Sequence, residues 1–186
     1  PLLVYVAATG LNLAGGAPAP SLDQFHPWYA VFLVFALGVL NPLEGPLGEE
    51  PGWRGFALPR LQSRWSPLVT AAVMGLLITA WHLPLVFMPQ FDLSLPDILT
   101  TILVTFWYTW LFNRTGGSVL LTLIAHATEG TVNIQGLWRP EAGGVGAVWA
   151  SLLAWALLVI VLLIFDRKSW RTAPESAIDR VPDRIS

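Results

Sequence analysis

The chain has 186 residues, of which 54% are hydrophobic and only 12% are charged, and its formal net charge is −2. Soluble domains carry roughly 25% charged residues, so this composition excludes an ordinary soluble domain and indicates a protein of the lipid bilayer. The charge gives no sign of a nucleic-acid partner. The lack of cysteine excludes disulfides and thiolate ligands, so a metal would have to be bound through nitrogen and oxygen.

Apolar runs separated by Gly and Pro predict the membrane spans. Residue 1 is proline and residues 2–6 are already apolar, so we expect the chain to begin inside a hydrophobic segment whose upstream part is missing. A helical span requires about 20 mainly apolar residues. On this basis the predicted spans are 1–14, 27–45, 67–87, 97–113, 117–133 and 145–165.

Residues 48–64 have a mixed character. Their apolar and aromatic residues are interleaved with arginines, which favours an interfacial or cavity-lining helix over one that faces lipid. Pro51 and Gly52 fit a helix that begins near Glu49, which would place its acidic residues in a first turn, where the helix dipole favours them. Aromatic residues near the span ends, Tyr108 among them, are typical of interfacial belts.

The basic residues predict the topology. Arg60 and Arg64 precede one span, Arg114 separates the next two, and five more Lys or Arg residues follow the last span. All of these fall on one face if the spans alternate, so we place the C-terminus in the cytoplasm. The prediction is an all-α polytopic transmembrane helical bundle of six or seven segments over residues 1–166. A polar cytoplasmic tail follows over residues 167–186, with no regular structure from Ser169 onward.

Two histidines and a Glu-Glu-Arg segment form the candidate site. His82 and His126 lie inside long uncharged runs, and ionisable groups within a membrane are costly unless they face a polar cavity. If residues 48–64 and 67–84 form an antiparallel hairpin, Glu49 and His82 reach the same depth, at a rise of about 1.5 Å per residue. His126 enters from the same face and reaches a similar depth. We therefore predict that one acid and two imidazoles meet at a buried polar cavity.

Such a set of side chains suits hydrolysis of a peptide bond. Neutral imidazoles bind zinc, zinc makes bound water more acidic, and a carboxylate can remove the proton of that water. His82, His126 and Glu49 are therefore the potential metal ligands or bases, and zinc is the expected cofactor. Glu50 and Arg54 are spaced i, i+4 with the acid first, which favours an ion pair. Arg54 would then hold Glu50 or a substrate carbonyl and leave Glu49 free as the base.

At these residues the chain resembles the CPBP intramembrane proteases, which include the CAAX prenyl proteases and the Abi or bacteriocin-processing proteins. The EExxxR motif of that family matches Glu49, Glu50 and Arg54. The resemblance covers roughly residues 40–133, and its three motifs occur in order. It implies an intramembrane protease in which Glu49 activates the water, by a zinc-dependent or a metal-free glutamate mechanism. It also implies a peptide or lipidated protein as substrate and a bacterial inner membrane as the setting.

The other two motifs match in their histidines and differ elsewhere. FxxxH matches at His82 with Ile78 in place of the Phe, and HxxxN matches at His126 with Gly130 in place of the Asn. The resemblance implies that both histidines bind metal or the oxyanion. The missing Asn implies altered metal affinity, a different substrate or lost activity.

Two polar residues downstream of His126 could face the same cavity. Glu129 follows it by three residues and Asn133 by seven. Asn133 would lie about 10 Å along the helix from His126, which makes it a poor substitute for the missing amide. Glu129 fits an interfacial or packing residue better than a ligand.

The sequence leaves three functions open. The preferred hypothesis is an intramembrane endopeptidase that hydrolyses a peptide bond of a membrane-associated protein or peptide. A second is a small proton-coupled transporter with a buried Glu and His relay, which would predict two pseudo-symmetric halves that the sequence does not show. The third is a catalytically altered immunity or adaptor protein on the same scaffold, and Gly130 is its best support.

Overall fold

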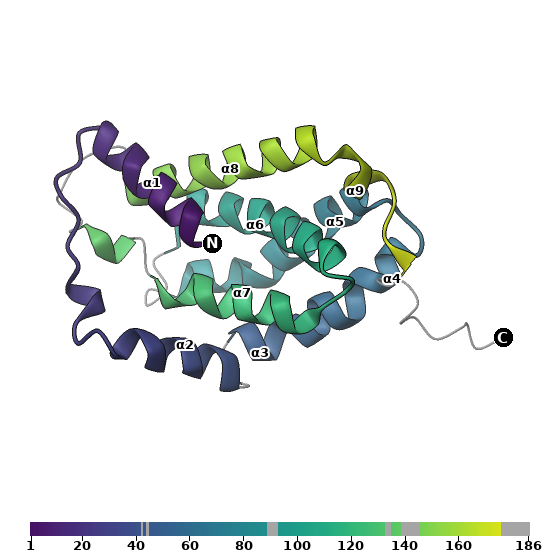
Figure 1. Ribbon diagram of the computed structural model, residues 1–186, viewed down its shortest axis with the longest axis horizontal. Helices are drawn as coiled ribbons and strands as arrows, with labels where there is room; N and C mark the ends of the chain where they lie inside the picture. The colour runs from purple at the N-terminus through teal and green to yellow at the C-terminus, as the bar shows by residue number, and fades with distance from the viewer. Residues whose placement is uncertain (42, 44, 89–92, 133–134, 139–145, 176–186) are drawn as a thin grey trace.

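The computed structural model describes the chain except for residues 42, 44, 89–92, 133–134, 139–145 and 176–186. Over the described residues every regular element is a helix. The α-helices are α1 (Leu2–Ala14), α2 (Ala30–Leu40), α3 (Gly45–Glu50), α4 (Leu58–Gln62), α5 (Pro67–His82), α6 (Leu95–Arg114), α7 (Val119–Thr131), α8 (Ala147–Phe165) and α9 (Arg167–Arg171). The longer ones form a bundle, with α8 along one edge and α2 and α3 along the opposite edge (Figure 1).

Four stretches of the described chain are long and apolar enough to cross a membrane. They are Ala30–Gln62, Pro67–Phe87, Leu95–Arg114 and Ala147–Phe165. Large apolar side chains, such as Leu153, Leu157 and Ile164 of α8, are exposed on the outside of the bundle. A soluble protein would bury such a surface, whereas a lipid bilayer solvates it. The predicted all-α membrane bundle is confirmed.

Serine side chains cap the helices that build the site. Ser66 Oγ accepts from the backbone of Val69 at the start of α5, and Ser118 Oγ accepts from the backbone of Leu121 at the start of α7. These bonds satisfy amide groups that have no partner within the helix. The turn between α6 and α7 uses two glycines at positive φ, 65° at Gly116 and 83° at Gly117, so α7 can fold back beside α6.

Two apolar clusters hold α6 in the middle of the bundle. The first joins α1, α6 and α8, and small residues such as Ala8 and Ala154 let these helices approach closely around Trp155. The second joins α4, α5 and α6 through four buried residues, Leu58, Met74, Ile78 and Phe112. Because α6 belongs to both clusters, its inward-facing polar residues are held in a fixed position between the other helices.

The helix that carries the acidic pair begins one turn earlier than the sequence predicts. It starts at Gly45, so Glu49 and Glu50 lie in the last turn of α3 and not in a first turn. The dipole argument for these carboxylates is therefore wrong. The chain continues through a π-helix, Pro51–Ala57, into α4. Since Pro51 has no N–H to donate, the wider π turn accommodates it without ending the helical course, and such turns are frequent at functional sites.

The start of the polar tail is ordered, so the prediction of no regular structure from Ser169 is wrong for residues 169–171. They belong to α9, where Trp170 is only 4% exposed and its indole N–H donates to the Leu162 carbonyl at 3.1 Å. Asp166, just before α9, accepts from Trp110 Nε1 at 2.8 Å and from Arg114 Nε at 2.7 Å. These contacts fasten α9 to the bundle. The rest of the predicted tail, residues 176–186, lies outside the described residues.

Candidate active site

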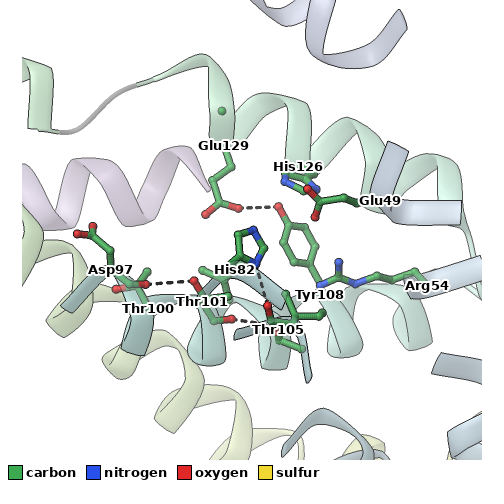
Figure 2. A pocket seen from close by; sticks show the side chains of 13 residues that line it. Glu49, Arg54, His82, Asp97, Thr100, Thr101, Thr105, Tyr108, His126 and Glu129 are labelled. Carbon is green, nitrogen blue, oxygen red and sulfur yellow. Dashed lines mark hydrogen bonds between the residues drawn. The ribbon is translucent and has the colours of Figure 1, made fainter. Parts of the chain in front are cut away.

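Four of the five site residues predicted from the sequence line one cavity in the bundle, and the fifth, Glu50, lies behind it. The cavity has a volume of about 330 Å³. Glu49 reaches it from α3, His82 from the end of α5 and His126 from α7, so the structure brings these three groups together (Figure 2). Arg54, Tyr108 and three threonines of α6 also line it. Glu49 and His82, which the helical rise predicts to lie at one depth, both line this cavity.

Gly45 shows how closely Glu49 and His126 approach each other. A methyl group placed on Gly45 would lie 2.9 Å from Glu49 Oε1 and 3.7 Å from His126 Nε2. The carboxylate and the imidazole therefore face the same small space beside the backbone of α3. A larger residue at position 45 would push the carboxylate away, so glycine is what permits this approach.

Glu50 lies behind these two groups, fully buried. Its Oε1 accepts from Arg54 Nη1 at 2.8 Å and lies 2.9 Å from His126 Nδ1. An ionised carboxylate can only accept, so Nδ1 of His126 carries the proton and donates it. In the neutral ring, Nε2 is then the unprotonated nitrogen, turned toward Glu49. The i, i+4 ion pair expected from the sequence is present, and it also orients a histidine.

His82 is oriented in a similar way by its own helix. Its Nδ1 lies 2.8 Å from the carbonyl oxygen of Ile78, which can only accept, so Nδ1 carries the proton. The edge of the Trp81 ring packs against the imidazole at a centroid distance of 4.9 Å. Nε2 of His82 is therefore the free nitrogen of the ring, on the cavity side of α5 (Figure 2).

Arg54 is a buried donor at the wall of the cavity. The residue is 3% exposed, and its Nε has no hydrogen-bond partner among the described residues. Its guanidinium lies over the Tyr108 ring, 4.5 Å from the centroid. Arg54 Nη1 therefore donates to Glu50, while Nε–H can still donate to another acceptor. A buried donor without a partner costs free energy, which makes it a candidate contact for a bound group.

Comparison with known proteins identifies the family. The model of the type II CAAX prenyl endopeptidase Rce1-like family matches residues 26–132, which include Glu49, His82 and His126. The chain belongs to this family. The resemblance read from the three sequence motifs is confirmed.

Two relatives show how much of a longer protein the match covers. This Rce1-like chain is 31% identical over 88 residues to the CAAX prenyl protease 2 of Methanococcus maripaludis. That match covers 42% of this chain and 32% of the relative. It is 32% identical over 120 residues to the probable multidrug resistance protein NorM of Caulobacter vibrioides, 61% of this chain and 25% of that protein. The chain therefore spans about a third or less of the length of each relative.

The zinc site predicted from Glu49, His82 and His126 is not tested by the structure. Over the described part of the Rce1-like chain, no three His, Asp or Glu residues group closely enough to hold an ion. The two free Nε2 atoms are of the chemical type that zinc binds. Zinc therefore stays a prediction.

Tyr108 and Glu129 also line the cavity, Tyr108 against the expectation from the sequence and Glu129 as its spacing from His126 allows. Tyr108 is 2% exposed, so its assignment to an interfacial belt is wrong. Its hydroxyl donates to Glu129 Oε2 at 2.6 Å (Figure 2). The spacing of three residues that puts Glu129 and His126 on one helix face therefore indicated its place correctly. Whether Glu129 acts as a packing residue or as a ligand stays a prediction.

Gly130 leaves room where the family motif has an amide. It lines the cavity, and a methyl group placed on it would meet nothing within 4 Å. A larger side chain could therefore be accommodated there. Asn133, the other polar residue considered as a substitute, lies outside the described residues.

Proposed function

We propose that the chain is an intramembrane endopeptidase of the CAAX protease type, which hydrolyses a peptide bond of a membrane-associated protein or peptide. The observation that carries this proposal is the approach of the Glu49 carboxylate to the free nitrogen of His126 beside Gly45, within a polar cavity of a membrane bundle. Burying ionisable side chains in a membrane costs free energy, and few functions other than catalysis would explain why an acid and two oriented imidazoles are buried together.

Glu49 is the proposed general base. A water molecule between Glu49 Oε1 and His126 Nε2 would have two acceptors for its hydrogens and would direct its oxygen lone pair at the substrate. Glu49 takes one proton as the water oxygen bonds to the carbonyl carbon. When the carbon–nitrogen bond breaks, the same proton passes to the leaving amine, and the products are a carboxylic acid and an amine.

Arg54 is the proposed donor to the substrate carbonyl. Its Nε–H is buried and lacks an acceptor among the described residues, and the residue lines the cavity. Negative charge develops on the carbonyl oxygen during attack, and a fixed donor in a site of low dielectric stabilises that charge. The ion pair with Glu50 holds the guanidinium in place, and the same carboxylate holds His126. Glu50 is thus a positioning residue for both.

The proposed orientation rests on the basic residues: we place the C-terminus in the cytoplasm, since Arg167, Lys168 and Arg171 follow the last span. The family resemblance supports a bacterial inner membrane as the setting. The substrate would be a peptide or lipidated protein that enters from the lipid phase.

The experiment compares the wild-type chain in liposomes with the Glu49→Gln variant, on prenylated and unprenylated peptides, with products identified by mass spectrometry. The wild type is expected to release a new carboxyl terminus and a new amine, and the variant is expected to release neither. Glu175→Gln, an exposed glutamate outside the spans, is the matched control and should cleave as the wild type does.

A catalytically altered adaptor is the second candidate, because Gly130 removes one polar group from the motif. It predicts a wild-type protein that cleaves no peptide although it is folded. The transporter hypothesis predicts uptake of a solute by liposomes, and loss of that uptake in the Glu49→Gln variant. The product assay and an uptake assay on the same liposomes separate the three.

A further inference from the structure

Glu129 and Tyr108 form a second polar pair in the cavity, apart from the proposed base. In the view of Figure 2, the carboxylates of Glu129 and Glu49 lie on opposite sides of the Tyr108 hydroxyl. We propose that Glu129 contacts the substrate, accepting a hydrogen bond from a backbone N–H next to the scissile bond, and that Tyr108 is its positioning residue. This inference rests on the proposed peptidase function and deepens it.

Glu129 is held at two points. Tyr108 Oη donates to its side-chain Oε2 at 2.6 Å, and Tyr5 Oη donates to its backbone carbonyl at 2.9 Å. The first bond fixes the direction of the carboxylate, whereas the second fixes only the end of α7. The two tyrosines therefore give two separable perturbations of one residue.

The Tyr108 ring connects this pair with the rest of the site. It lies beneath the Arg54 guanidinium, 4.5 Å from ring centroid to Cζ, and its centroid is 5.6 Å from that of the His126 ring. With the ring fixed on two sides, its hydroxyl has little freedom. Glu129 is thus held at a set position relative to the groups proposed to act on the scissile bond.

A packing role does not account for a carboxylate at this place. Within the described residues, the ion pairs of Arg54 and His126 are made with Glu50, and none is made with Glu129. A carboxyl group among membrane helices that makes no direct ion pair is costly to bury, and an apolar residue would pack α7 at lower cost. A hydrogen-bond donor of the bound substrate would explain why Glu129 is kept at this position despite the free-energy cost of burying it.

The carboxylate has the capacity for such a donor. A carboxylate offers about four acceptor positions, and Tyr108 uses one of those on Oε2. A peptide N–H that enters a cavity inside the membrane loses its water and requires an acceptor. Glu129 lies one helical turn from His126 and next to Gly130, where no side chain competes for the space. The acceptor thus lies beside the reacting groups.

The test measures kcat and KM of peptide cleavage by the full chain in liposomes. Glu129→Ala is expected to lower kcat/KM by about 10- to 100-fold, the range for loss of a hydrogen bond to a charged group. Tyr108→Phe keeps the ring and its contact with Arg54, and is expected to lower kcat/KM by about fivefold to tenfold. The double variant should be no slower than Glu129→Ala alone, because Tyr108 acts through Glu129.

Two further variants separate substrate contact from support of the fold. Tyr5→Phe removes the bond to the backbone of Glu129 and should leave kcat/KM unchanged, whereas a role of Glu129 in holding α7 would make both tyrosine variants slow. Gly130→Asn supplies an amide acceptor into open space, and it should raise kcat/KM more when added to Glu129→Ala than when added to the wild type. A packing defect would not be repaired by that substitution.

The outcomes distinguish this inference from the function on which it rests. If the wild type cleaves no peptide, the proposed function fails and this inference fails with it. If the wild type cleaves and Glu129→Ala cleaves equally well, only this inference is overturned. It is also overturned if the losses from Tyr108→Phe and Glu129→Ala multiply, or if Gly130→Asn raises kcat/KM no more in Glu129→Ala than in the wild type. Should Glu129→Ala not fold, the contrast between Tyr108→Phe and Tyr5→Phe decides.

Discussion

Replacing Gly45 by alanine should separate activity from stability. The added methyl group would lie 2.9 Å from Glu49 Oε1 and 3.6 Å from its Cδ. A comfortable contact is about 3.5 Å, so the carboxylate must move by roughly half an ångström. Because a displacement of about 1 Å in a reacting group can cost about 100-fold in rate, we expect kcat to fall by about tenfold. The helix itself tolerates alanine, so the free energy of unfolding should be unchanged or slightly raised.

The assay measures peptide cleavage and thermal unfolding on the same preparations in detergent. Gly10→Ala is the matched control, because Gly10 lies in the middle of α1 and a methyl group there meets nothing within 4 Å. It should raise the free energy of unfolding by up to about 1 kcal/mol and leave cleavage unchanged. A Gly45→Ala variant that is as stable as the wild type and cleaves equally fast would refute the placement of Glu49 as the base.

The remaining predictions concern the ion pairs and the metal. Arg54→Met leaves the Glu50 carboxylate buried without its guanidinium partner, so the free energy of unfolding should fall by about 3 kcal/mol. Denaturant unfolding curves measure this change, and an unchanged curve would contradict a stabilising ion pair between the two residues. The indole and guanidinium that donate to Asp166 lower the pKa of its carboxyl, so this stabilisation is present above the ordinary pKa of an aspartate and is lost as pH falls below it. Unfolding curves from pH 7 to pH 3 should show that loss in the wild type and less of it in Asp166→Asn. If zinc is bound through the imidazoles, elemental analysis should find less of it in His82→Ala and His126→Ala than in the wild type, and equal content would contradict the zinc prediction.

The convergence of the site could be predicted because it depends on two regular quantities. A fixed rise per residue and a hairpin about residue 65 bring Glu49 and His82 to one depth, and the structure has both in the same cavity. The Glu50–Arg54 pair followed from helical spacing alone. Inferences from helical rise and spacing hold as long as the chain stays helical, whether its turns are α-helical or π-helical.

Other parts of the site depend on packing that sequence spacing does not describe. The start of α3 at Gly45 is set by the contacts of α3 and the π-helix with α7, so Pro51 misled the prediction of where the helix begins. Tyr108 has the composition of a membrane-belt residue, and only its place between Arg54 and Glu129 shows that it belongs to the cavity.

The central claim is that Glu49 removes the proton of the attacking water, and the cleavage rate of the Glu49→Gln variant at saturating substrate tests it most directly. Glutamine keeps the shape of the side chain and removes its basicity, so kcat should fall at least about 100-fold while helical content and KM stay near those of the wild type. A variant that is folded, saturable and as fast as the wild type would contradict the account.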